Sequence, residues 1–155
     1  PGAPASRAAM TSLGHLARRF AGSLSRRPPS EADASWAVAQ LLPAEAALWQ
    51  RMAVQDKRHS ILVTRRFVDI ADEPSREQTA AALLHGVGKL ASGLGTCARV
   101  LATIVGPRTA RFRQYHDHER LGAEMLRAAG SAAATLELVH GAGPAAAALR
   151  QADDI

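Results

Sequence analysis

Five of the six histidines lie beyond the N-terminal segment, and their side chains are the strongest candidates for chemistry in this 155-residue sequence: His59, His85, His116, His118 and His140. An aspartate pair, Asp153 and Asp154, lies close to the end of the chain. Imidazole nitrogens and carboxylate oxygens suit divalent transition metals, and helical bundles build such sites from side chains on facing helices. Because histidines also occur as surface residues and as hydrogen-bonded core residues, their spacing alone leaves these alternatives open.

The elements that must position these side chains are predicted to be helices. Alanine supplies 34 residues, and only two Trp, one Tyr and three Phe are present, a composition that favours helix over sheet. The sequence pattern predicts helices over 31–41, 56–68, 76–85, 97–105, 132–140 and 145–155, a helix opening at Pro43, a helical turn over 111–116 and a helix ending before Gly130. We therefore expect an all-α fold, built as a compact multi-helix bundle.

Serine residues mark three of the expected helix starts. Ser30, Ser75 and Ser131 each stand directly before a predicted helix, where a hydroxyl can accept a hydrogen bond from a free backbone N–H. Gln78 follows Ser75 at the spacing of a capping box. These residues predict where the helices over 31–41, 76–85 and 132–140 begin.

The segment 81–89, Ala-Ala-Leu-Leu-His-Gly-Val-Gly-Lys, closely resembles the signature of the HD-domain superfamily, in which a helix ends in His-Asp followed by Gly-Lys. Four further pieces match that family in order: Arg58-His59 resembles its first histidine, segment 118–126 its His-Pro-Glu-x-Gly-Ala-x-x-Leu stretch, Val139-His140-Gly141 the place of a His-His pair, and segment 151–154 its closing Ala-Asp. The resemblance covers residues 56–155.

This resemblance implies an HD-like helical bundle with a phosphohydrolase site that holds one or two divalent metal ions, such as Mn, Fe, Mg or Zn. Mapped onto this sequence, His59, His85 and Asp153 are the expected metal ligands. His118 and His140 match the additional ligands of family members that carry a second metal.

The resemblance also implies a phosphate-containing small molecule as the substrate, a nucleotide or a small phosphate ester. Lys89 follows the motif at the family's spacing, and its compact positive charge would neutralise a substrate phosphate.

The sequence departs from the family at Gly86, where the family carries the aspartate of His-Asp. Glycine has no donor atom, so one anionic ligand is missing. Three interpretations therefore stay open. The first is a working phosphohydrolase with a reduced ligand set. The second is a degenerate domain that keeps a phosphate- or nucleotide-binding pocket or serves as a protein-interaction module. The third is a helical interaction protein that binds through its basic arm.

The net charge of +5 belongs to the N-terminal thirty residues. Five of the 19 basic residues lie in 1–30, which contains no carboxylate, so the remaining 14 balance the 14 acidic residues. We expect residues 1–30 to form a flexible arm, either a solvated tail or a weak contact with an anionic partner. Residues 31–155 are expected to form the HD-like domain, with its motifs in 56–155.

Other features exclude whole classes of protein. The single cysteine, Cys97, excludes an internal disulfide and a multi-cysteine zinc site. No stretch reaches the roughly 18 apolar residues of a transmembrane helix, and no secretory segment is recognisable, so we expect a cytoplasmic protein. Because the chain begins with Pro1, we expect a natural start at Met10 and allow for a domain that continues past Ile155.

Overall fold

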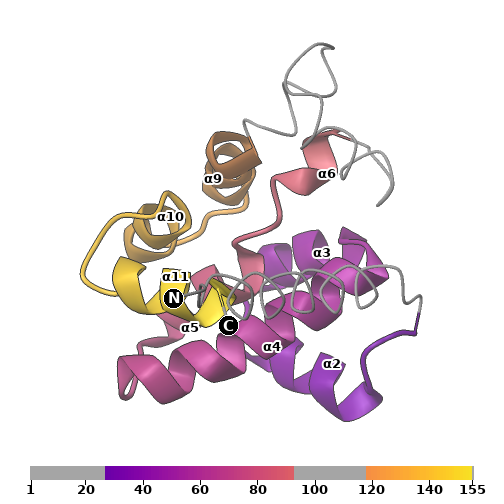
Figure 1. Cartoon of the computed structure of the whole chain (residues 1–155). Helices are drawn as coiled ribbons and strands as arrows, with labels where there is room; N and C mark the ends of the chain where they lie inside the picture. Colours follow the sequence, from indigo (N-terminus) through magenta and orange to yellow (C-terminus); the bar gives the residue numbers. More distant parts are fainter. Residues whose placement is uncertain (1–26, 93–117, 155) are drawn as a thin grey trace, which may run out of the picture.

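The computed structural model describes residues 27–92 and 118–154. Within these ranges every regular element is a helix and no strand occurs, which confirms the predicted all-α fold (Figure 1). In chain order the helices are α2 (Glu31–Ala39), α3 (Pro43–Arg51), α4 (Val54–Ala71), α5 (Arg76–Leu84), α6 (Lys89–Ser92), α9 (His118–Ala128), α10 (Ala133–Val139) and α11 (Ala146–Asp154). The helix predicted over 97–105, the turn over 111–116 and most of the arm, residues 1–26, lie outside the described residues.

Two of the three predicted serine caps are confirmed. The Ser30 hydroxyl accepts a hydrogen bond from the backbone N–H of Asp33 at the start of α2. Ser75 and Gln78 form a reciprocal capping box at the start of α5, because each side chain accepts from the other residue's backbone N–H. Pro43 is the first residue of α3, where its missing N–H costs nothing.

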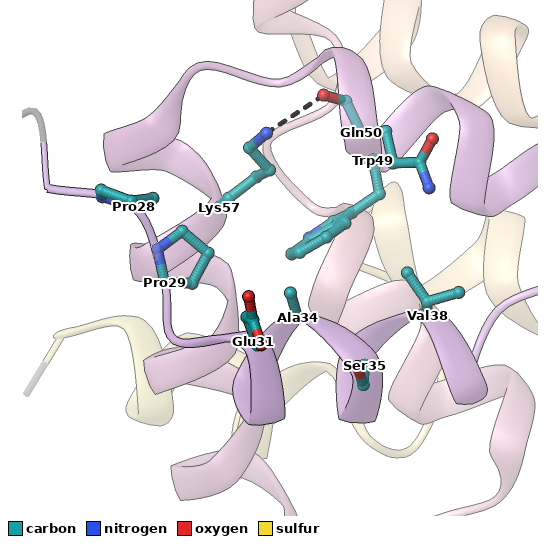
Figure 2. A pocket seen from close by; sticks show the side chains of 9 residues that line it. All are labelled: Pro28, Pro29, Glu31, Ala34, Ser35, Val38, Trp49, Gln50 and Lys57. Carbon is teal, nitrogen blue, oxygen red and sulfur yellow. Dashed lines mark hydrogen bonds between the residues drawn. The ribbon is translucent and has the colours of Figure 1, made fainter.

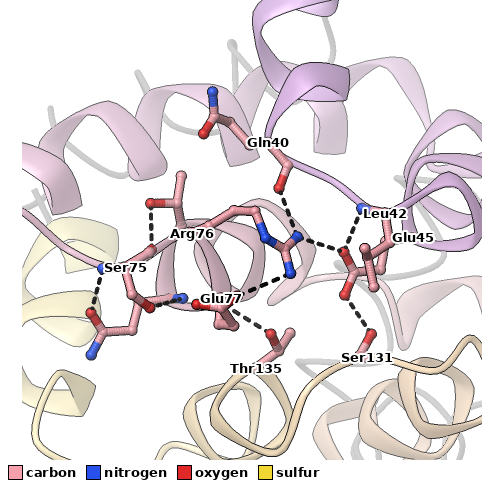
Figure 3. A network of polar contacts seen from close by, with 10 residues as sticks. Gln40, Leu42, Glu45, Ser75, Arg76, Glu77, Ser131 and Thr135 are labelled. Carbon is pink, nitrogen blue, oxygen red and sulfur yellow. Dashed lines mark hydrogen bonds and ion pairs between the residues drawn. The ribbon is translucent and has the colours of Figure 1, made fainter.

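The third predicted cap is wrong, because α10 begins one residue later than predicted. Helix α10 has Ala132 at its N-cap, with no side-chain cap. The Ser131 hydroxyl instead donates to Oε1 of Glu45, 2.7 Å away, while Oε2 of Glu45 accepts from the backbone N–H of Leu42 at 2.8 Å (Figure 3). Glu45 is fully buried, and an Arg76 guanidinium nitrogen lies 3.8 Å from its carboxylate. This carboxylate thus links α3, the start of α5 and the α9–α10 connection.

Helix α5 lies in the core of the bundle. Its residues from Thr79 to Leu84 are all buried, and the helix packs against α4, α10 and α3. Three consecutive alanines, Ala80 to Ala82, give this helix a narrow profile that lets its neighbours approach closely. As a result, the end of α5 at Leu84 is held in position from several sides.

Helices α11 and α9 also lie near the end of α5. Helix α11 packs along α4 and buries Leu149 and Ala152 (Figure 1). On another side, α9 approaches the turn that follows α5 so closely that a Cβ on Gly122 would lie 3.1 Å from the backbone nitrogen of Gly88. Only glycine at position 122 permits this approach without a shift of the backbone.

None of the helices in the described ranges has both the length and the apolar character that crossing a membrane requires.

The buried carboxylate of Glu45 generates a stability prediction. Glu45→Ala removes the acceptor of the Leu42 N–H and the Ser131 hydroxyl, so we expect the free energy of unfolding to fall by about 2–4 kcal/mol in urea titrations. Glu31→Ala, at an exposed first-turn position of α2, is the matched control and should cost less than about 1 kcal/mol. Equal losses in the two variants would show that the Glu45 network does not hold the bundle together.

Candidate metal and phosphate site

Three helices bring His59, His85 and Asp153 together. His59 lies on α4, His85 directly follows the last residue of α5, and Asp153 lies near the end of α11. A ligand atom from each of them lies within 4.8 Å of the other two. Among the side chains that the structure describes, which exclude those of residues 118 and 119, this is the group of His, Cys, Asp or Glu whose spacing suits a metal ion.

The closest contact in this group joins α4 to α11. Nε2 of His59 lies 2.8 Å from Oδ1 of Asp153, and the two side chains are 35% and 39% exposed. A carboxylate oxygen beside an imidazole nitrogen attracts a cation to the space that the two groups share. Asp153 therefore marks a position in the site where positive charge is stabilised.

The His85 ring is neutral, and its Nε2 lone pair is directed toward Asp153. Its Nδ1 lies 2.7 Å from the carbonyl oxygen of Ala82, which can only accept, so Nδ1 carries the hydrogen. Burial lowers the pKa of His85 from 6.5 to about 4, although the Ala82 carbonyl and Asp153 act in the other direction. The ring is therefore neutral at pH 7, and its Nε2 is an unprotonated donor 3.9 Å from Oδ1 of Asp153.

The donor set fits a divalent transition metal. Two imidazoles and one carboxylate form a common ligand combination for such ions, and the Ala82 carbonyl supplies the outer hydrogen bond that fixes the His85 tautomer. The rings of His59 and His85 meet edge to face, with their centroids 5.5 Å apart. Ligands about 2.1 Å from one ion lie at most about 4 Å apart, so the widest separation in this group needs a closure of less than about 1 Å.

Lys89, the predicted phosphate-binding residue, lies beside this group. Its Nζ is 3.9 Å from Oδ1 of Asp56, which lies one turn before His59 on α4. A Cβ added to Gly86 would lie 3.5 Å from the same Nζ, an ordinary van der Waals distance. The ammonium group thus lies next to the position from which a side chain at residue 86 would project.

A pocket of about 160 Å³ opens beside His85 and Asp153. Its lining comes from the end of α5, the start of α6, the end of α10 and α11: His85, Gly86, Lys89, Leu138, Val139, Gly141, Ala146, Leu149, Arg150 and Asp153. Arg150 was not singled out from the sequence, although it lies one helical turn before Asp153 with the spacing that places two residues on one face. Its Nη1 donates to the carbonyl of Gly141 at 3.1 Å.

Of the two histidines proposed for a second metal, only His140 has a described side chain, and it is not part of this group. His140 is exposed at the C-terminal cap of α10 and does not line the pocket, although its neighbours Val139 and Gly141 do. His118 is the first residue of α9, and its side chain lies outside the described residues.

A larger, shallower hollow of about 420 Å³ lies elsewhere, against α2, α3 and α4 (Figure 2). Trp49 forms its floor, and its indole N–H donates to the Ser60 hydroxyl. Lys57 lies over the Trp49 ring and donates to the carbonyl of Gln50. Glu31 supplies the one carboxylate of this lining, so the hollow lacks the grouped ligands found at the end of α5.

The lowered pKa of His85 predicts how stability depends on pH without metal. Between pH 6.5 and about 4 the unfolded chain binds a proton at this residue that the folded protein excludes, so acidification destabilises the fold, by up to about 3 kcal/mol over the full range. In chelator, urea titrations of wild type should therefore lose more stability over this range than His85→Gln. The same pH dependence in both proteins would contradict a neutral, buried His85.

Comparisons with known proteins identify no relative, so a function for this chain has to be argued from the geometry of the site. No family model, no curated protein and no solved structure matches the chain. The resemblance to the HD-domain superfamily therefore stays a prediction from the sequence motifs.

Proposed function

We propose that this protein is a metal-dependent phosphohydrolase of the HD type that acts on a nucleotide or a small phosphate ester. The observation that carries the proposal is the convergence of His59, His85 and Asp153 from three helices that are distant in the sequence. A random distribution of histidines over a helical bundle gives no reason for these three motif positions to meet. The adjoining pocket, with Lys89 in its wall, supplies room for a substrate.

In this proposal His59, His85 and Asp153 hold one divalent ion. When bound, such an ion lowers the pKa of a water molecule and polarises a phosphoryl oxygen. His85 is ready to bind, because its Nε2 is unprotonated and its ring is held by Ala82. His59 would bind through Nε2, which already lies 2.8 Å from the Asp153 carboxylate, so the two groups can reach one ion together.

Lys89 and Asp56 have separate tasks in the proposed reaction. The Lys89 ammonium neutralises charge on the substrate phosphate, and Asp56, 3.9 Å away, holds the ammonium at the pocket wall. Asp56 is a positioning residue, since it acts through Lys89. With its side chain only 13% exposed, Asp56 is shielded from solvent, so its attraction for Lys89 is less screened than that of a surface ion pair.

One observation favours a second candidate, a domain that binds phosphate without turnover. Gly86 leaves the site without the carboxylate that the family places next to His85, and Lys89 lies beside the empty position. Fewer anionic ligands weaken the hold on a hard cation and on its bound water. A binding domain of this kind would keep the pocket and its lysine but show no hydrolysis.

Metal content separates the proposal from its alternatives. We expect protein purified without chelator, then loaded with Mn²⁺ and desalted, to retain close to one equivalent by mass spectrometry of metals. Asp153→Asn should reduce this content at least tenfold, because its neutral amide replaces the anionic ligand. Asp154→Asn changes the adjacent, exposed aspartate, which lies outside the metal-ligand group, and is the matched control.

Hydrolysis of p-nitrophenyl phosphate and bis-p-nitrophenyl phosphate by the same samples tests turnover. We expect activity that follows metal content across the variants. Retention of less than a tenth of an equivalent of Mn, Fe, Zn and Co alike would overturn the metal-dependent proposal. Full loading without turnover of either ester would favour the binding domain.

Restoring the missing carboxylate is a second test. We expect Gly86→Asp to raise Mn²⁺ affinity at least tenfold and to increase turnover, because a side chain fits at this position and adds an anionic donor beside His85. Gly86→Asn is the matched control, with nearly the same shape and no charge. Unchanged affinity in Gly86→Asp would mean either that the new carboxylate pairs with Lys89 instead or that His85 is not a ligand, and Gly86→Asp combined with Lys89→Gln distinguishes the two.

A further inference from the structure

The pocket beside the metal-ligand group has two positively charged side chains in its wall. Lys89 comes from the start of α6 and Arg150 from α11, so they reach the pocket from different elements. The other ionisable groups in the lining are His85, which is neutral at pH 7, and Asp153. Asp153 is already in contact with His59, and Asp56 lies beside Lys89 outside the lining.

We propose that Lys89 and Arg150 form a clamp for the phosphate group of a compact phosphomonoester. This inference rests on the proposed function, because it names the anion that the pocket beside the metal ligands would take. An arginine offers five N–H donors in a planar fork that matches two phosphate oxygens, and a lysine adds a compact charge. Together they suit the terminal phosphate of a monoester, which carries up to two negative charges.

The contact between Arg150 and Gly141 supports this role. Nη1 of Arg150 donates to the Gly141 carbonyl at 3.1 Å, which fixes the guanidinium at the edge of the pocket. One N–H of the fork is used in this contact, and the other nitrogen atoms can still donate to a ligand. Gly141 is itself part of the pocket lining, so the contact holds Arg150 at the place where the ligand would bind.

The size and the remaining wall of the pocket limit the rest of the ligand. At about 160 Å³ the pocket is smaller than the roughly 300–1,000 Å³ of most sites for drug-sized ligands. Four aliphatic side chains, Leu138, Val139, Ala146 and Leu149, form the part of the wall that carries no charge. A phosphate with a short apolar group fits this space, whereas the ribose and base of a nucleotide would remain outside it.

The clamp is tested by phosphate binding to metal-free protein. Calorimetric titrations of inorganic phosphate in excess chelator at pH 7.5 should show binding to the wild type, and Arg150→Gln and Lys89→Gln should each weaken it about tenfold or more. Arg51→Gln is the matched control, because Arg51 is exposed at the end of α3 and does not line the pocket. It should bind phosphate as the wild type does.

A purely structural role of Arg150 predicts a different result. In that case Arg150→Gln would lower the melting temperature by loosening the Gly141 contact, and the folded protein would bind phosphate with unchanged affinity. That outcome overturns the clamp, as does a wild type that binds no phosphate. Arg150→Lys, which keeps the charge without the fork, should recover part of the lost affinity.

The same titration with two esters tests the compact ligand. Ethyl phosphate should bind at least as tightly as inorganic phosphate, and AMP should bind no tighter than ethyl phosphate. AMP binding more than tenfold tighter than ethyl phosphate would overturn the size limit.

Failure of the clamp and failure of the proposed function give different results in these experiments. Normal Mn²⁺ loading and turnover, together with unchanged phosphate affinity in Arg150→Gln, would remove the clamp alone. Phosphate binding that depends on Lys89 and Arg150 in a protein that retains no metal would remove the hydrolase and leave the clamp.

Discussion

The burial of α5 is the constraint on which the rest of the described structure depends. A short helix that is buried from Thr79 to Leu84 must be covered from several directions, and α3, α4 and α10 cover it. Because α5 is held in this way, His85 at its end has a fixed position and a hydrogen bond to Ala82 that orients its ring. The candidate site therefore takes its rigidity from the packing of the core. Its other two residues are His59 on α4 and Asp153 on α11, which packs along α4.

The charges at the end of α5 follow from this arrangement. Burial keeps His85 neutral at pH 7, and the Asp153 carboxylate lies 2.8 Å from Nε2 of His59, so two imidazoles and one carboxylate gather at one place. A divalent cation would satisfy the same groups at once. Lys89 lies on the side where the motif glycine leaves space, and it makes that side of the pocket suited to an anion. Metal and phosphate would thus meet at the boundary between two oppositely charged halves of one site.

Much of this structure could be predicted from the sequence, and the exceptions have physical causes. Local patterns correctly predicted the helical class, the Ser30 and Ser75 caps and the start of α3, because capping depends on neighbours in sequence. Ser131 was predicted wrongly, since α10 starts one residue later and the Ser131 hydroxyl bonds instead to Glu45, a partner from a distant helix that no local pattern reveals. Arg150 was missed for the same reason: its place in the pocket depends on how α10 and α11 fold back toward α5.

The measurement that tests the central claim most directly is the location of bound metal in crystals grown with Mn²⁺. An anomalous difference map should show one peak within about 2.3 Å of Nε2 of His59, Nε2 of His85 and a carboxylate oxygen of Asp153. A map with no peak at these three residues, from protein shown to be folded and exposed to excess Mn²⁺, would contradict the account.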